Sequence, residues 1–125
     1  MKSYQPHADR EQKLASAVAI AGLAVSATEL YPTHRKELLS IACWKATELD
    51  GKYNTRHRSE GILKASGKAK KNHEHVVPRK LLICLMLGHA DKADFIIRQA
   101  VGCLVTSEEH ARLPDAVDGL LGWDR

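Results

Sequence analysis

A run of twelve mostly apolar residues near the N-terminus constrains the fold of this chain more than any other feature. The run, LASAVAIAGLAV at 14–25, contains no charged side chain. It is shorter than the roughly 20 residues that a helix needs to cross a bilayer, so we expect a helix that other parts of the protein cover. Asp9 and Glu11 precede the run, whereas a secretory signal peptide begins with a positively charged region. The pattern therefore predicts a helix over 9–30, with Asp9 as its N-cap, in a soluble protein.

The residues that cover this helix must be mainly aliphatic, because aromatic residues make up only 5% of the chain. A second helix is predicted over 34–49, with Thr33 as its N-cap, since apolar residues recur there at helical spacing. With 125 residues, of which 44% are hydrophobic, the chain is long enough to bury a core and has the usual size of one domain. We expect one mainly α domain over 1–125, in which 1–50 form a helical pair.

Positive charge is concentrated in the middle of the chain. Residues 51–80 contain nine Lys and Arg residues against Glu60 and Glu74, a net charge of +7, although the whole chain carries only +4. A basic segment of this kind is typical of a surface that binds phosphates, and a solvated loop explains it equally well. The residues that we expect to contact a nucleic-acid backbone are Arg56, Arg58, Lys64, Lys68, Lys70, Lys71, Arg79 and Lys80.

Three cysteines, Cys43, Cys84 and Cys103, lie far apart, each within an apolar run. Buried thiols that form no disulfide have this setting, and the sequence has neither a CxxC pair nor an even number of cysteines. Together with the shortness of the N-terminal apolar run, this pattern predicts a cytoplasmic protein without a membrane partner.

Two short apolar segments, each next to ionisable side chains, are the clearest candidates for a site. The first lies in KKNHEHVVPRK and the second in GCLVTSEEHARL, and their strand-like parts are 75–77 and 103–105. If they pair as a β-hairpin, Glu74, His75 and His110 converge at one end of it. A carboxylate and two imidazoles beside basic residues can hold a divalent metal ion and activate a water next to a phosphate.

Helix signals surround these two segments. Pro78 suits the first position of a helix over 79–89, and a short helix is expected over 59–65. Thr106 and Glu109 have the S/T-x-x-E spacing of a capping box. The sequence has no glycine-rich phosphate loop of Walker or Rossmann spacing and no HExxH motif, which excludes the nucleotide-binding and zinc-protease classes that these motifs define.

The layout Glu-His-Val-Val-Pro followed by Leu-Val-Thr-x-Glu-Glu-His-x-x-Leu resembles the ββα-metal motif of the HNH endonuclease family, over roughly 72–113. The resemblance implies that Glu74 and His110 are metal ligands and that His75 is the general base that activates water. It also implies a divalent metal cofactor, Mg²⁺, Mn²⁺ or Zn²⁺, and cleavage of phosphodiester bonds in nucleic acid, in DNA more than RNA. We therefore expect a small helical domain with one short β-hairpin, an α+β arrangement with a ββα-metal-like element.

Two departures from the family pattern keep other functions open. No asparagine follows Asn72, so the family's central position is unassigned, His89 being a weak substitute. The spacer between His75 and His110 is also longer than a compact motif needs. One alternative is a non-catalytic module, a degenerate HNH fold included, that binds nucleic acid or an acidic protein. The other is a small mobile-element protein that inhibits another enzyme.

Overall fold

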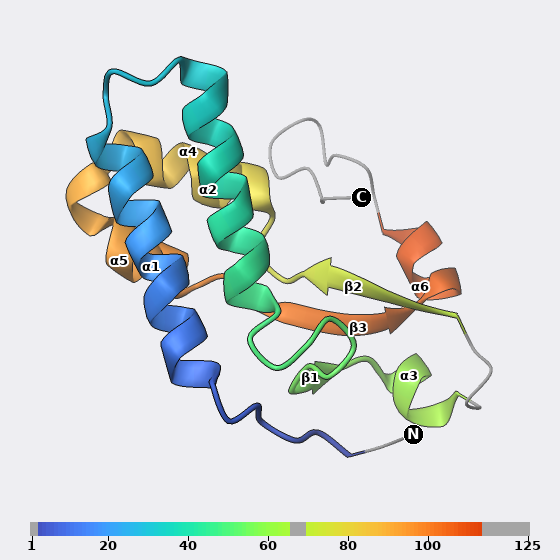
Figure 1. The fold of residues 1–125 in the computed structure, drawn as a ribbon. Helices are drawn as coiled ribbons and strands as arrows, with labels where there is room; N and C mark the ends of the chain where they lie inside the picture. The colour runs from blue at the N-terminus through green and yellow to red at the C-terminus, as the bar shows by residue number, and fades with distance from the viewer. Residues whose placement is uncertain (1–2, 66–69, 114–125) are drawn as a thin grey trace.

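The chain forms a group of packed helices at one end and a small β-sheet at the other (Figure 1). The computed structural model describes residues 3–65 and 70–113. The helices are α1 (Arg10–Ser26), α2 (Pro32–Thr47), α3 (Glu60–Lys64), α4 (Arg79–Gly88), the 3₁₀ turn η1 (Ala90–Lys92), α5 (Ala93–Ile97) and α6 (Ser107–Arg112). The strands are β1 (His57–Arg58), β2 (Lys71–His75) and β3 (Gly102–Thr106). The prediction of a mainly α fold with a small β element is confirmed.

Helix α1 buries one face rather than its whole circumference. Ala17, Ala21 and Ala24 are fully buried, and their spacing of four and three residues aligns them on one side of the helix. Leu23 is 71% exposed. The predicted helix is confirmed, but its complete enclosure is wrong: in the described part of the chain α2, α4 and α5 pack against the side that carries these alanines, and Leu23 is left exposed. Within the described residues, no helix combines the length and hydropathy that crossing a membrane requires.

Helix α2 begins earlier than predicted, at Pro32, so Tyr31 rather than Thr33 precedes its first turn. Proline suits this position because its φ angle is preset for a helix and the missing N–H would have no partner there. The buried side of α2 meets α1, α4 and α5 in an aliphatic core, as the composition implied. This core consists of Ala17, Ala21, Ala24, Val25, Leu39, Ala42, Cys43, Ala46, Leu82, Met86, Ala93, Ile96, Ile97 and Ala100.

Asp50, just after α2, fixes the N-terminal segment against the loop that follows. Its carboxylate accepts hydrogen bonds from the Tyr4 hydroxyl and the His7 N–H, each at 2.8 Å, and from Arg10 Nε at 3.2 Å. Burial opposes ionisation of this carboxyl and is the largest single influence on its pKa, but these hydrogen bonds together outweigh it and lower the pKa. The loop that carries Lys52 therefore starts from a fixed point.

The sheet has the strand order β1–β3–β2, which leaves β2 at one edge. β2 and β3 pair antiparallel with Glu74 opposite Cys103 and His75 opposite Gly102, so the predicted pairing of the two segments is confirmed. The predicted hairpin is wrong in two respects. The connection between the strands is not a turn but contains α4, η1 and α5, and β1 adds a third strand parallel to β3.

Strand β2 also lies earlier in the sequence than its apolar residues suggested, at Lys71–His75 rather than 75–77. Backbone pairing with β3, which runs from Gly102 to Thr106, holds this polar stretch in the sheet. Just outside the paired residues, the Ser107 N–H donates to the Lys70 carbonyl at 3.0 Å. Val76 follows the strand and is exposed. A polar strand is tolerated there because its side chains find partners in α6.

Helix α6 starts with the predicted capping box, which is confirmed. The Thr106 hydroxyl accepts from the Glu109 N–H at 3.1 Å, and Glu109 Oε1 accepts from the Thr106 N–H at 2.8 Å. The same carboxylate oxygen accepts from the Ser59 hydroxyl at 2.5 Å, which ties α6 to the start of α3. Gly61 allows this approach, because a Cβ there would lie 2.7 Å from the Glu109 carboxyl carbon.

Replacing Glu109 by alanine should destabilise the protein by about 1–2 kcal/mol, because two hydrogen bonds to its carboxylate are lost at once. The neighbouring Glu108 is a matched control: it lies in the same first turn, and among the described residues its recorded contact is an exposed ion pair with Arg112 at 2.9 Å. Glu108→Ala should change stability by less than about 0.5 kcal/mol. Urea denaturation of the two variants and the wild type measures the difference, and equal losses would contradict this role of Glu109.

Repeating the urea denaturation of wild type and Glu109→Ala at lower pH tests whether the ionised carboxylate is the cause of the stabilisation. Hydrogen bonds from the Ser59 hydroxyl and then from the Thr106 N–H hold the pKa of Glu109 below its ordinary value of 4.5. A carboxylate with a lowered folded-state pKa stabilises the fold fully above its unfolded-state pKa, and loses this effect as the pH falls through the folded-state value. The difference in the free energy of unfolding between wild type and Glu109→Ala should be constant above about pH 6 and should become smaller below about pH 4.5.

Candidate functional site

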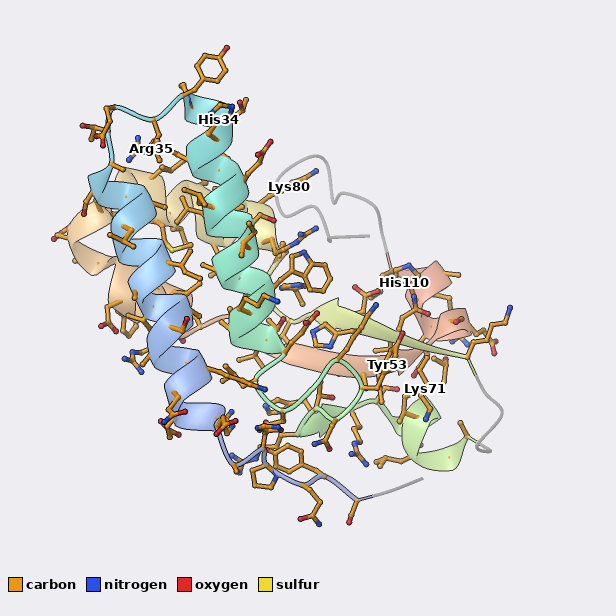
Figure 2. All side chains as sticks on the ribbon, viewed as in Figure 1. His34, Arg35, Tyr53, Lys71, Lys80 and His110 are labelled. Carbon is orange, nitrogen blue, oxygen red and sulfur yellow. The ribbon has the colours of Figure 1, made fainter. Side chains whose placement is uncertain are left out.

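Glu74 of β2 and His110 of α6 are in direct contact although 36 positions separate them, with Glu74 Oε1 against His110 Nδ1. Glu74 is only 4% exposed, whereas the His110 side chain is partly open to solvent. Figure 2 shows His110 on α6, above β2. The structure therefore brings together the two residues for which the sequence predicted a shared role as metal ligands.

The local sequence explains why these two side chains meet. α6 follows β3 with no intervening residue, so its first turn lies over the end of the β2–β3 pair. Side chains alternate between the faces of a strand, and Asn72 and Glu74 therefore share the face of β2 that α6 covers. The Ser107 hydroxyl donates to Asn72 Oδ1 at 2.7 Å, which fastens the start of α6 to the strand.

His75 lies elsewhere. It is 1% exposed, and its ring packs edge-on against the Trp44 ring of α2, with the centroids 4.4 Å apart. Alternation along β2 directs His75 away from the face that holds Glu74. Among the described residues, no three His, Cys, Asp or Glu side chains are grouped so that they could hold a metal ion. Of the three residues expected to converge, the structure unites Glu74 and His110 and keeps His75 apart.

His73 shares the inward face with His75, with ring centroids 5.9 Å apart. His73 is only 8% exposed, because it lies inside β2 and under the loop after α2. Its Nδ1 is 2.7 Å from the Lys52 carbonyl oxygen. A carbonyl oxygen only accepts hydrogen bonds, so Nδ1 has the proton, and the bond fixes the loop that contains Lys52 and Tyr53.

A hollow of about 200 Å³ opens at the outer edge of β2, the edge that does not pair with β3. Its position lets side chains of both faces of β2 reach it. Figure 2 shows three of its members, His110, Tyr53 and Lys71, on the same side of the molecule. The hollow is lined by Trp44, Lys52, Tyr53, Lys71, Asn72, His73, Arg79 and His110.

The cations of this hollow differ in how firmly they are held. The Arg79 guanidinium lies over the Trp44 ring, 4.6 Å from its centroid, and donates to the Ser40 hydroxyl at 3.0 Å. Lys71 is partly exposed and Lys52 is exposed. Lys52, Lys71 and Arg79 give the hollow three positive charges, which are suited to a bound phosphate group.

The other basic residues expected to bind nucleic acid are spread over the surface. Lys64 and Lys70 line a second hollow between α3 and α6, and Arg56 lines a third beside Asp50. Arg58 Nε donates to the Thr55 carbonyl at 3.2 Å. Lys80 lies on α4 next to Lys36, and Lys68 lies outside the described residues. Of the predicted set, only Lys71 and Arg79 join His110 at one hollow.

The site predicted from the sequence did not include Lys52, Tyr53 or Trp44, which line this hollow. Lys52 and Tyr53 lie between α2 and β1, where the sequence has no regular periodicity that would place them over β2. The prediction that all three cysteines are buried is partly wrong. Cys43 is buried, but Cys84 is exposed on α4. Cys103 is half-buried, and burial, together with the nearby Glu109 charge, raises the pKa of its thiol.

Comparison of the chain with family models, with curated proteins and with solved structures finds no match.

The residues themselves must therefore indicate what the site can bind. Glu74 Oε2 is buried and has no hydrogen-bond partner among the described residues. A buried carboxylate oxygen in this state needs a cation or a donor, since removing it from water is costly. Carboxylate and imidazole are also the donors that Mn²⁺ and Zn²⁺ accept, so Glu74 and His110 fit a divalent ion.

Gly102 should be essential for the packing behind this site. A Cβ at Gly102 would lie 2.5 Å from Cε1 and 2.7 Å from Nε2 of His73, so Gly102→Ala should destabilise the protein by about 1–3 kcal/mol through overpacking. Gly22→Ala is the matched control, because nothing lies within 4 Å of its built Cβ. Gly22 is inside α1, where alanine should be neutral or stabilising by up to about 1 kcal/mol. Equal effects in urea denaturation would contradict the tight contact at His73.

Proposed function

We propose that this protein is a metal-dependent hydrolase of nucleic-acid phosphodiester bonds, with a site of the HNH type. One observation underlies the proposal: Glu74 and His110, far apart in the sequence, meet where two antiparallel strands lead into a helix. This is the arrangement that the resemblance to the HNH family implied for the two metal ligands.

The ligands and the substrate are proposed to share the edge of β2. Glu74 and His110 would hold a divalent ion, and a bound ion of this kind polarises a phosphoryl oxygen and lowers the pKa of water. Two protein ligands suffice for Mg²⁺, which usually keeps several waters and takes further oxygens from a phosphate. Lys71 and Arg79, at the same hollow as His110, would bind the phosphate on either side of the scissile bond.

The role of general base is proposed for His75 on the resemblance alone. In the present arrangement Trp44 covers its ring, and His75 is separated from solvent. To accept a proton from water, His75 would need the Trp44 ring to move, and Arg79 stacks on that ring. Binding of a phosphate to Arg79 is therefore the event most directly linked to uncovering His75.

A non-catalytic module that binds nucleic acid is the second candidate, and the burial of His75 favours it. If Trp44 stays in place, the site keeps its positive charge and its ligands but lacks a residue that activates water. Binding would then weaken steeply with rising salt, as counterion release requires, and a metal chelator would leave it unchanged.

Nicking of supercoiled plasmid with Mg²⁺ or Mn²⁺ tests the first candidate. The wild type should nick the plasmid, and chelation of the metal should abolish the reaction. Glu74→Gln and His110→Ala should each lower the rate by at least about 10- to 100-fold, because each removes a metal donor. His75→Ala should lower it by about 100-fold or more if the residue is the general base.

His34→Ala is the matched control, since His34 is an exposed histidine near the start of α2. It should nick at the wild-type rate, and circular dichroism should show that every variant retains its helices. A folded wild type that never nicks with either metal would contradict the hydrolase. So would nicking by His110→Ala at the wild-type rate.

A further inference from the structure

We infer that the hollow beside His110 takes a single unpaired nucleotide, with its base stacked on Tyr53, and that the substrate is therefore single-stranded or locally unpaired nucleic acid. This inference names the substrate class of the proposed hydrolase site and rests on that function. Its basis is the combination of an open aromatic ring with cations at the edge of β2.

Tyr53 is exposed at the hollow, where its ring is open to stacking by a base. It is 51% exposed, although the chain contains few aromatic residues, and it lines the hollow that includes His110. The loop beneath it is fixed, because Asp50 anchors its start and His73 Nδ1 donates to the Lys52 carbonyl at 2.7 Å. A rigid loop lowers the entropy lost when a ligand stacks on the ring.

Trp44, the other large ring in the hollow, is already engaged. The Arg79 guanidinium lies 4.6 Å from its centroid, and the His75 ring meets it edge-on at 4.4 Å. Within residues 3–65 and 70–113, the recorded ring contact of Tyr53 is with the Lys52 ammonium, whose Nζ lies 5.4 Å from the centroid. A base entering the hollow therefore stacks on Tyr53 rather than on Trp44.

Size and charge indicate one nucleotide of a longer chain. The hollow measures about 200 Å³, less than the roughly 300–1,000 Å³ of pockets that enclose a whole drug-sized ligand. Lys52, Lys71 and Arg79 surround it with positive charge suited to the phosphates on both sides of the base. Positive charge attracts single strands and duplexes alike, whereas stacking on a side chain requires a base that has left its own stack. Tyr53 is thus the residue that would make the protein bind a single strand in preference to a duplex.

Fluorescence anisotropy with a labelled 12-nucleotide single strand, and with the same strand in a duplex, tests this inference. EDTA in the buffer removes metal, so that binding is measured without cleavage. The wild type should bind the single strand more tightly than the duplex. Tyr53→Ala should weaken single-strand binding by about 5- to 150-fold, the range found when a stacking aromatic is removed, and should leave duplex binding within about 2-fold.

Two matched variants accompany this measurement. Tyr53→Phe keeps the ring and should bind the single strand as the wild type does. Tyr31→Ala removes another exposed tyrosine, which lies before α2 and packs against His34, away from the hollow, and it should change neither affinity. The inference is overturned if Tyr53→Ala leaves single-strand binding intact, if it weakens both substrates equally, or if the wild type binds neither.

The inference and the proposed function fail in different ways. If metal-dependent nicking needs His110 but Tyr53→Ala leaves single-strand binding unchanged, the inference is overturned and the proposed hydrolase function still stands. Single-strand binding that needs Tyr53, without nicking under any metal condition, supports the inferred ligand and points to the non-catalytic module.

Discussion

The antiparallel register of β2 and β3 determines which side chains of β2 face α6 and which face α2. With Glu74 opposite Cys103, the helix that follows β3 places His110 over the Glu74 carboxylate. A shift by one residue would turn Glu74 toward α2 and His75 toward α6, since neighbouring side chains point to opposite faces. Gly102 helps to fix this register, because only glycine leaves room for the His73 ring beside β3.

Because β2 lies at the edge of the sheet, side chains from both of its faces border the candidate site. On one face, a buried carboxylate meets an imidazole, and on the other, two histidines pack under Trp44. Because no strand of the described part of the chain covers the edge, the hollow there is reached from both faces and from the loop after α2. Movement of Trp44 and Arg79 would connect the two faces, and this is the structural difference between the proposed hydrolase and a module that only binds.

The sequence was most informative where a local physical rule applies. The Thr106–Glu109 capping box follows from a short-range pattern. The pairing of the two strand segments, and with it the approach of Glu74 to His110, was expected because both segments are short, apolar and next to ionisable side chains. Features set by tertiary contacts were missed. Strand β2 took up polar residues because β3 and α6 supply their partners, and His73 was buried by a loop that nothing in the sequence places over it. The metal and the substrate remain predictions, as does the role of His75.

Anomalous diffraction from crystals soaked in Mn²⁺ would test the central claim most directly, because it locates the ion without relying on activity. The account predicts an anomalous peak within bonding distance of both Glu74 and His110, and its loss in crystals of His110→Ala soaked in the same way. Absence of this peak in wild-type crystals, or manganese bound only at carboxylates on the surface, would contradict the account. The contact between Glu74 and His110 would then serve only to hold α6 on the sheet.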